Sequence, residues 1–322
     1  MKITNRHGPR SIRRSAPLVV TSIVLTALAI WLSSPATAAT IYVNNVLGND
    51  RFNGESARPA GVNLGPVATI SRAVRLAGSG GRVVVAKTER PYYENVVLFG
   101  YENSGTRAAP FRIEGQGAIL DGTIPVPDDA WESLGEGVFR FRPQLPGPQQ
   151  LYYEGKPLRQ VKPSSEQIAR PPLAPLEWCY YDAHIYFRVE PTSVPENYQL
   201  RYAGRQAGIL LYRVEHVEIS GLVIQGFALD AVQSKDLVGR VELVGLNLRG
   251  NGRSGLSVEG ASRVRLSESL VGNNGRAQVR TAGYSRTDLV NCDVLDNTAP
   301  KYALAGGELT IDGVVHRGES PE

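Results

Sequence analysis

Between residues 230 and 297 the chain reads DAVQSKDLVGRVELVGLNLRGNG (230–252), RSGLSVEGASRVRLSESLVGNNG (253–275) and RAQVRTAGYSRTDLVNCDVLDN (276–297). The line GILLYRVEHVEISGLVIQGF (208–227) precedes them, and a weaker line, KYALAGGELTIDGVVHRG (301–318), follows. The region from Arg205 to His316 therefore repeats every 22 to 24 residues. Self-similarity at such a period predicts a solenoid, in which each repeat buries its apolar face only against its neighbours.

The N-terminal segment 1–38 has the pattern of an export signal. Five basic residues precede an apolar core at 18–32, and Ala36-Thr37-Ala38 is a small-residue cleavage site. An uncleaved membrane anchor is the alternative, which the short apolar core disfavours. Cleavage would remove five basic and no acidic residues and change the net charge from +4 to −1. We therefore expect an exported protein, at the cell surface, in the periplasm or outside the cell, without a membrane span and without a charge suited to nucleic acid.

The start of the mature chain, 39–86, is predicted to cap the solenoid. Thr69 is a candidate N-cap, the following residues place apolar side chains on one helical face, and Gly78 ends the helix. A helix here would cover the exposed end of the first coil. The loop before it contains Asn49-Asp50 and Asn53-Gly54, which either close tight turns or supply oxygen ligands to calcium.

Several N-terminal segments together carry a resemblance to a known family. These segments are YVNN (42–45), GND (48–50), GPVATISRAVRLAGSGGRVVV (65–85), YYENVVLFG (92–100) and SGTRAAPFRIEGQGAILDG (104–122). With the later repeats, they resemble the pectate-lyase-like superfamily of secreted right-handed parallel β-helix proteins, which includes polysaccharide lyases of the alginate-lyase and chondroitinase B type. The resemblance implies an all-β, right-handed parallel β-helix and a polysaccharide partner, but fold alone does not define an activity.

The segment 123–204 interrupts the repeat and has a different composition. It holds 12 of the chain's 24 aromatic residues. Runs such as EWCYYDAHIYFRVEP (177–191) predict strands, with a hairpin turning at Asp182-Ala183. We interpret 123–204 as a β-rich insertion into a single domain that spans 39–322. Its aromatic residues Trp131, Trp178 and Tyr181 are candidates for stacking on sugars.

Residues one repeat apart become neighbours about 4.8 Å apart in a parallel β-helix, so columns of side chains can be read from the sequence. Asparagines at the turns are expected to form hydrogen bonds along their column. Two apolar columns alternate with polar residues and are expected to face the core. The predicted columns are Ile219, Leu243, Leu266, Leu289 and Ile311; Ile224, Leu248, Val271 and Val294; and Asn251, Asn274 and Asn297.

Arginines recur on the expected outer surface. Arg240, Arg263 and Arg286 are 23 residues apart, which predicts a row of guanidinium groups on one face. Such a row is suited to bidentate contacts with an anionic glycan. The alternative is a solvated ion-pair network, because the neighbouring column contains Glu242, Arg265 and Asp288.

A second group of basic residues is the candidate catalytic site. Lys235, Arg253, Arg276 and Arg280 lie on adjacent repeats, beside a predicted outward column of Gln233, Ser257 and Arg280. A polysaccharide lyase needs a base to remove the proton next to a uronate carboxylate and a cation to stabilise the anion that forms. Lys or Arg serves as that base in the enzymes that the chain resembles. The alternative is a basic surface without chemistry.

Other chemistries have less support in the sequence. We find no paired carboxylates on the coils, so glycoside hydrolysis would lack its acid and base. The remaining histidines, His184, His216 and His316, are scattered and suggest neither a zinc site nor a catalytic triad. The sequence thus favours a lyase-like enzyme acting on an acidic, uronate-containing polysaccharide. The alternative function is that of a non-catalytic β-helix that binds glycan or serves as an envelope or surface structural module.

Overall fold

The structure is a computed structural model that describes residues 1–2, 4, 38–163 and 169–317. The predicted export signal lies outside these residues except at its ends. The chain divides into two units, and the second, Ala38–Glu322, contains the whole fold described below. Within the described residues, no helix has the length and apolar character needed to cross a membrane.

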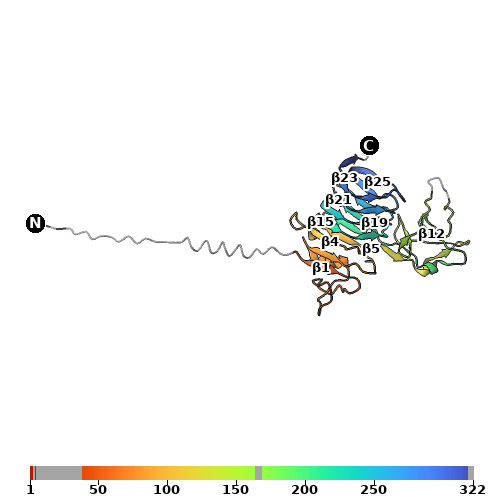
Figure 1. The fold of residues 1–322 in the computed structure, drawn as a ribbon, viewed down its shortest axis with the longest axis horizontal. Coiled ribbons are helices and arrows are strands. Elements are labelled where there is room, and N and C mark those ends of the chain that lie inside the picture. Colours follow the sequence, from red (N-terminus) through yellow and green to blue (C-terminus); the bar gives the residue numbers. More distant parts are fainter. Residues whose placement is uncertain (3, 5–37, 164–168, 318–322) are drawn as a thin grey trace. The chain divides into compact units, whose positions relative to one another are not determined.

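The second unit is a parallel β-helix of about four turns, which confirms the predicted fold class (Figure 1). Each complete coil passes through three faces, which we call sheets A, B and C. Sheet A contains β3 (Val96–Phe99), β14 (Ile209–Tyr212), β17 (Asp230–Lys235) and β20 (Ser254–Val258). Sheet B contains β1 (Thr40–Val43), β2 (Arg82–Val85), β4 (Phe111–Glu114), β15 (Glu215–Ser220), β18 (Gly239–Val244) and β21 (Arg263–Ser267).

Sheet C forms the third face, and two long strands join the other faces. Sheet C contains β5 (Ile119–Asp121), β16 (Val223–Gln225), β19 (Asn247–Arg249), β22 (Leu270–Gly272) and β24 (Asp293–Val294). The strands β23 (Val279–Val290) and β25 (Tyr302–Ile311) each run through sheet A and then sheet B. In these last two coils, an irregularity in the strand register between Gly283 and Arg286 marks the passage from sheet A to sheet B.

The predicted columns are confirmed by strand register. Leu243 is paired with Leu266, and Leu266 with Leu289, while Ile219 and Ile311 extend the column at either end. The second column, Ile224 to Val294, is paired in the same way in sheet C. The side chain of Leu266 is fully buried, as expected for a residue stacked between two leucines. Stacking of apolar side chains between coils is thus what stabilises the solenoid.

The asparagine column also forms, with one addition. Nδ2 of Asn251 donates to Oδ1 of Asn274 at 3.0 Å. Gln278 then stands between the next two members: its Oε1 accepts from Asn274 Nδ2 at 2.9 Å, and its Nε2 donates to Asn297 Oδ1 at 3.2 Å. The buried amides satisfy one another along the turns between sheet C and sheet A.

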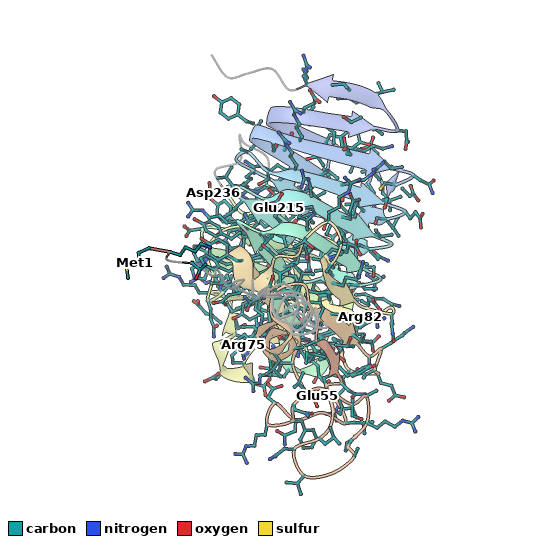
Figure 2. All side chains as sticks on the ribbon, turned by 90° about the vertical axis from the view of Figure 1, so that its left-hand side faces the viewer. Met1, Glu55, Arg75, Arg82, Glu215 and Asp236 are labelled. Carbon is teal, nitrogen blue, oxygen red and sulfur yellow. The ribbon has the colours of Figure 1, made fainter. Side chains whose placement is uncertain are left out.

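The N-terminal cap is the predicted helix. Helix α2 spans Ile70–Ala77, and the Thr69 hydroxyl accepts a hydrogen bond from the Arg72 amide at 3.1 Å. Its buried residues join the core of the first coils. Figure 2 shows Arg75 and Arg82 at this end of the molecule, with Glu215 and Asp236 on coils further up. In the preceding loop, the carboxylate of Asp50 accepts bonds from the Ala68 and Thr69 amides, so it links the loop to the helix start.

The opposite end of the solenoid is closed by a hairpin. Strand β26 (Val314–Arg317) turns back and pairs antiparallel with the second half of β25. Arg317 on β26 forms an ion pair with Glu308 on β25 at 3.1 Å. A short, charged edge strand is a common means of discouraging further strand pairing.

Between β5 and β14 the chain leaves the coils and builds two small antiparallel sheets beside them (Figure 1). Their own core contains fully buried Trp178, and β11 and β12 form the predicted hairpin, with Asp182 and Ala183 both at positive φ. The elements are β6 (Thr123–Pro125), η2 (Asp128–Ala130), β7 (Glu132–Ser133), β8 (Val138–Phe141), β9 (Leu151–Tyr153), β10 (Lys156–Pro157), β11 (Trp178–Tyr181), β12 (His184–Arg188), η3 (Pro195–Tyr198) and β13 (Arg201–Ala203); η1 (Gly100–Asn103) belongs to the first coil.

The insertion is attached to the coils through hydrogen bonds to backbone. The buried Tyr152 hydroxyl donates to the Gly250 carbonyl at 2.6 Å. Gly250 has φ +64°, and a Cβ there would lie 2.1 Å from that hydroxyl oxygen, so this position requires glycine. The insertion is therefore seated on the turns between sheet C and sheet A.

Candidate functional site

A cleft of about 340 Å³ lies where the insertion meets the coil turns, and we call it the seam cleft. The coils contribute Gly252, Gly275 and Arg276, which belong to two successive Asn-Gly-Arg turns. A Cβ on Gly252 would lie 2.4 Å from the Ala228 carbonyl, so the turn leaves no space for a side chain there. The insertion contributes Pro148, Gln149, Gln160, Lys162 and Tyr180.

Lys162 of the insertion contacts the turns of two successive coils. Its Nζ donates to the carbonyls of Gly275 and Thr298, both at 2.8 Å. Partial burial of the amine, followed by repulsion from Arg276, lowers the pKa of Lys162 below its ordinary value of 10.5. The structure therefore favours the neutral amine at this position more than solvent would.

Arg276 is the one predicted catalytic residue that lines the seam cleft. Its backbone amide donates to the Arg253 carbonyl at 2.9 Å, which fixes the start of its coil. None of the described residues lining the cleft is an aspartate or glutamate, and no described carboxylate forms an ion pair with the Arg276 guanidinium. The cleft is thus cationic and open to an anionic ligand.

Two polar groups at the cleft have unused hydrogen-bonding capacity. Gln149 is almost completely buried, and its Nε2 donates to the Leu145 carbonyl at 2.7 Å. This bond orients the amide and leaves Oε1 without a partner among the described residues. The hydroxyl oxygen of Tyr180 accepts from the Gly147 amide at 3.4 Å, while its proton has no described acceptor. Gln149 Oε1 is shielded from solvent. A hydroxyl group of a ligand could therefore donate to it only if the Gln149 side chain turned outward.

A second cavity of about 360 Å³ adjoins the seam cleft. The two cavities share Gln160, Lys162 and Gly275, so Lys162 stands between them. Arg159 lines the second cavity, and again no described lining residue is acidic. We call these two adjoining cavities together the groove.

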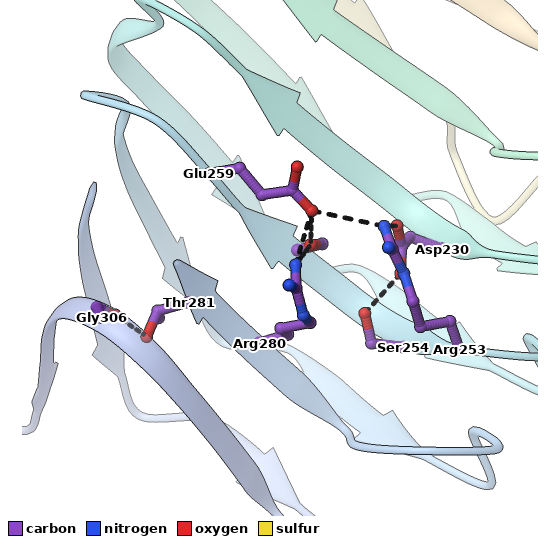
Figure 3. Close-up of polar contacts among 8 residues, drawn as sticks. Asp230, Arg253, Ser254, Glu259, Arg280, Thr281 and Gly306 are labelled. Carbon is purple, nitrogen blue, oxygen red and sulfur yellow. Dashed lines mark hydrogen bonds and ion pairs between the residues drawn. The ribbon is translucent and has the colours of Figure 1, made fainter. Parts of the chain in front are cut away.

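Arg253 and Arg280, by contrast, are engaged with carboxylates on the outer face of sheet A (Figure 3). The fully buried Asp230 carboxylate binds Arg253 through both oxygens, at 3.0 Å to Nε and 2.5 Å to Nη2. Glu259 accepts from Arg280 at 2.6 Å and from Arg253 at 3.4 Å. This network joins three coils and neutralises the charges of Arg253 and Arg280, which disfavours the catalytic role predicted for these two arginines. It also explains why Ser257 in the predicted outward column is buried.

Lys235 lies apart from the seam cleft. It ends β17, where its register partner on β14 is Tyr212, on the sheet B side of sheet A. Arg276 instead lies on the side where sheet C passes into sheet A. The four predicted catalytic residues thus occupy three different environments, and Arg276 alone lines the groove.

Of the predicted sugar-stacking residues, Trp178 is contradicted by its burial, whereas the roles of Trp131 and Tyr181 stay predictions. Trp178 is fully buried, and its indole donates to the Leu158 carbonyl at 3.0 Å. Trp131 is partly buried and packs edge-on against Phe141 of the same core, with ring centroids 4.7 Å apart. The ring centroids of Tyr181 and Tyr186 are 6.4 Å apart. The aromatic composition of the insertion reflects its own core, since a small antiparallel unit needs large side chains to bury enough surface.

The arginine row is present on the outer face of sheet B. Arg263 and Arg286 are register partners, and Arg240 precedes them on β18. Arg240 contacts His216 at 3.0 Å and Glu215 at 3.4 Å, so its guanidinium group lies beside both residues of the preceding coil. Glu242, Arg265 and Asp288 form the neighbouring column, as predicted.

Sheet B also contains a carboxylate pair, contrary to the sequence interpretation. Glu218 and Glu242 are register partners on β15 and β18. Arg112 donates to Glu218 at 2.6 Å, whereas burial, and then the charges of Glu218 and Asp288, raise the pKa of Glu242 against the opposing effect of Arg265. Both carboxylates line two shallow cavities of about 360 and 390 Å³. The repeat that places Ile219 beside Leu243 also places Glu218 beside Glu242, but the sequence interpretation began this outer column at Glu242.

Sequence reasoning missed the insertion's share of the groove. Lys162, Gln149 and Tyr180 follow no repeat, so no column placed them next to Arg276. Two weak signals in the sequence could have indicated the cleft. The Asn-Gly-Arg turns contain the glycines that line it, and the insertion 123–204 begins after a strand of sheet C and ends before a strand of sheet A.

Comparisons with known proteins support the fold. No protein-family model matches the chain, and no curated protein matches it. A solved structure described as a glycoside hydrolase superimposes with a TM-score of 0.58 at 12% identity, covering 85% of this chain and 77% of that chain. A chain from the complex of XylC with xylose gives a TM-score of 0.37 at 12% identity, covering 84% and 69%. The first comparison shows a shared architecture. The TM-score of the second comparison is too low to support a conclusion.

Proposed function

We propose that this protein binds an acidic polysaccharide in the seam cleft and cleaves it by β-elimination. The observation that carries the proposal is the lining of the cleft, where Lys162 and Arg276 face no described acidic residue. A uronate supplies the carboxylate that such a lining attracts and the hydroxyl groups that its amides can bind. The glycoside hydrolase that shares the fold is consistent with a carbohydrate ligand, although a fold does not define a reaction.

The residues of the cleft match the needs of the elimination. The reaction breaks the C5–H bond and the bond from C4 to the glycosidic oxygen, forms a C4–C5 double bond, and transfers a proton to the leaving oxygen. Arg276 would bind the carboxylate and stabilise the anion formed when the C5 proton leaves. Lys162 would take that proton, and the Tyr180 hydroxyl would donate one to the leaving oxygen.

The contacts of Lys162 suit the role of base. A neutral amine has two N–H bonds and one lone pair, and the carbonyls of Gly275 and Thr298 can accept both hydrogens. The lone pair is then the remaining free direction. Because the pKa of Lys162 is lowered, the neutral fraction rises with pH earlier than for an ordinary lysine. Activity should therefore increase with pH through an apparent pKa below 10.5.

The test is the ultraviolet absorbance of unsaturated products after incubation with polygalacturonate, alginate and chondroitin. Lys162→Met should lower the rate by about 10²-fold or more, and Arg276→Gln should weaken both binding and turnover. Lys235→Met serves as the matched control, because Lys235 lies outside the groove, and should keep the wild-type rate. Binding without product would mean that the protein is a non-catalytic glycan-binding module. The proposal is refuted if every polyuronate gives no binding and no product.

A second candidate function, glycoside hydrolysis, is favoured by one specific observation, the Glu218–Glu242 pair. Strands in register lie about 4.8 Å apart, near the carboxylate separation of retaining glycosidases. Arg112 forms an ion pair with Glu218, and the raised pKa of Glu242 favours a protonated acid. Saturated reducing ends, lost in Glu242→Gln but kept in Lys162→Met, would select this reaction over elimination.

A further inference from the structure

The outer face of sheet B carries a row of exposed guanidinium groups that the seam cleft does not use. Arg240, Arg263 and Arg286 stand on β18, β21 and β23, and all three are exposed. Arg240 contacts His216 and Glu215, but Arg263 and Arg286 form no ion pair with any side chain in the described ranges. The charges of these two arginines are therefore available to a partner.

The neighbouring column does not cancel this row by direct contact. Glu242 lies two residues after Arg240, and Asp288 two residues after Arg286, which is about 7 Å along the backbone in each case. Arg265 is the register partner of both carboxylates and lies between them. No ion pair joins Arg263 or Arg286 to these carboxylates within the described residues. The two columns together carry four arginines and two carboxylates, and the guanidinium groups of Arg263 and Arg286 keep their donors free.

The spacing of the row defines the partner that it fits. Strand register sets successive arginines about 4.8 Å apart along the solenoid axis, and one sugar of an extended 1,4-linked chain spans about 5 Å. A polyuronate lying along the axis would therefore bring about one carboxylate to each guanidinium group. A compact anion could contact only one or two members of such a row.

The ends of the row limit its length. On one side lies the cavity of about 360 Å³ that Arg107, His216 and Arg240 line. On the other side the register partner of Arg286 is Glu308, which already pairs with Arg317. Glu215, next to Arg240, marks the first end in Figure 2. Three to four sugars would span this distance.

We infer that Arg240, Arg263 and Arg286 form a second polyuronate-binding surface, which holds a chain of three to four sugars along sheet B, outside the seam cleft. This inference shares its ligand class with the proposed function but uses different residues and no chemistry. Its contacts are exposed, so binding should be modest and should weaken with salt.

The experiment measures binding of galacturonate oligomers of one to six sugars by calorimetry, with maltohexaose as the neutral control. It uses the full chain carrying Arg276→Gln, which removes the main cation of the cleft. Affinity should rise from one to about four sugars and then level off, and adding Arg263→Ala with Arg286→Ala should weaken it about tenfold. Arg265→Ala, on the same strand as Arg263 but in the mixed column, is the matched control and should change affinity less than twofold.

Two results would overturn the inference. One is an Arg276→Gln protein that binds no oligomer, and the other is a triple variant that binds as well as Arg276→Gln alone. Failure of the proposed function has a different signature, because it shows as the absence of unsaturated product from the wild-type chain while binding to the row persists.

Discussion

The coils and the insertion bury their side chains by different rules. In the coils, Leu266 contacts the same kind of residue above and below, and one repeat determines the next. In the insertion, Trp178 packs in a core that nothing else in the chain repeats. The periodic part supplies a long, regular surface, and the aperiodic part supplies single side chains, such as Lys162, that reach onto it. The groove lies where the two parts meet, so its lining combines the regular coil turns with single side chains of the insertion.

The largest expected effect comes from breaking the insertion's core. Trp178→Ala should cost about 4 kcal/mol, because it removes a fully buried indole and leaves a cavity. Hydrogen exchange should show lost protection in β8, β11 and β12, while β18 and β21 keep theirs. Equal loss in the coils would mean that the two regions fold as one cooperative unit and would contradict the comparison.

The coil core should be less sensitive to a single truncation. Leu266→Ala should cost about 3 kcal/mol in chemical denaturation, since it removes one of a stack of leucines. Because each coil contacts only its neighbours, hydrogen exchange should increase mainly in β18, β21 and β23. A cost below about 1 kcal/mol would show that the column collapses around the gap.

The ion-pair network on sheet A should matter next. Asp230→Asn should cost about 2 kcal/mol, because it leaves the half-buried Arg253 without its main counter-charge. Asp236→Asn is the matched control, since Asp236 pairs with Arg213 on the surface, and it should cost less than about 1 kcal/mol. Equal effects in thermal unfolding would argue that burial adds nothing to the sheet A pair.

The smallest effect is a pH dependence at the outer face of sheet B. The hydrogen bond from Arg82 lowers the pKa of Glu114 below its ordinary value of 4.5. A lowered carboxylate pKa gives stability that is present above the unfolded-state pKa and is lost as pH falls through the folded-state pKa. Glu114→Gln should remove this acid-side loss, less than about 1 kcal/mol given the exposure of Arg82. Denaturation of both proteins at about pH 7 and pH 3 would reveal it, and an unchanged pH profile would contradict it.

These contrasts also explain how far the sequence could predict the structure. Periodicity placed Leu243 beside Leu266 and Arg263 beside Arg286, because strand register converts a sequence period into a spatial neighbour. The same period places Asp230 beside Arg253, 23 residues later, but it does not show that the two side chains turn toward each other and form an ion pair. Nor could it place Lys162 on the Gly275 turn, because residues 113 apart came together through an insertion with no repeat.

The proposed function requires that a glycan binds where the insertion meets the coils. Hydrogen exchange of the Lys162→Met protein with and without a galacturonate hexamer tests this claim most directly. We predict new protection at 148–162 and at the 252–276 turns, together with a weaker effect along β18, β21 and β23. Protection confined to sheet B, or none at any position despite saturating hexamer, would contradict the claim that the seam cleft is the binding site.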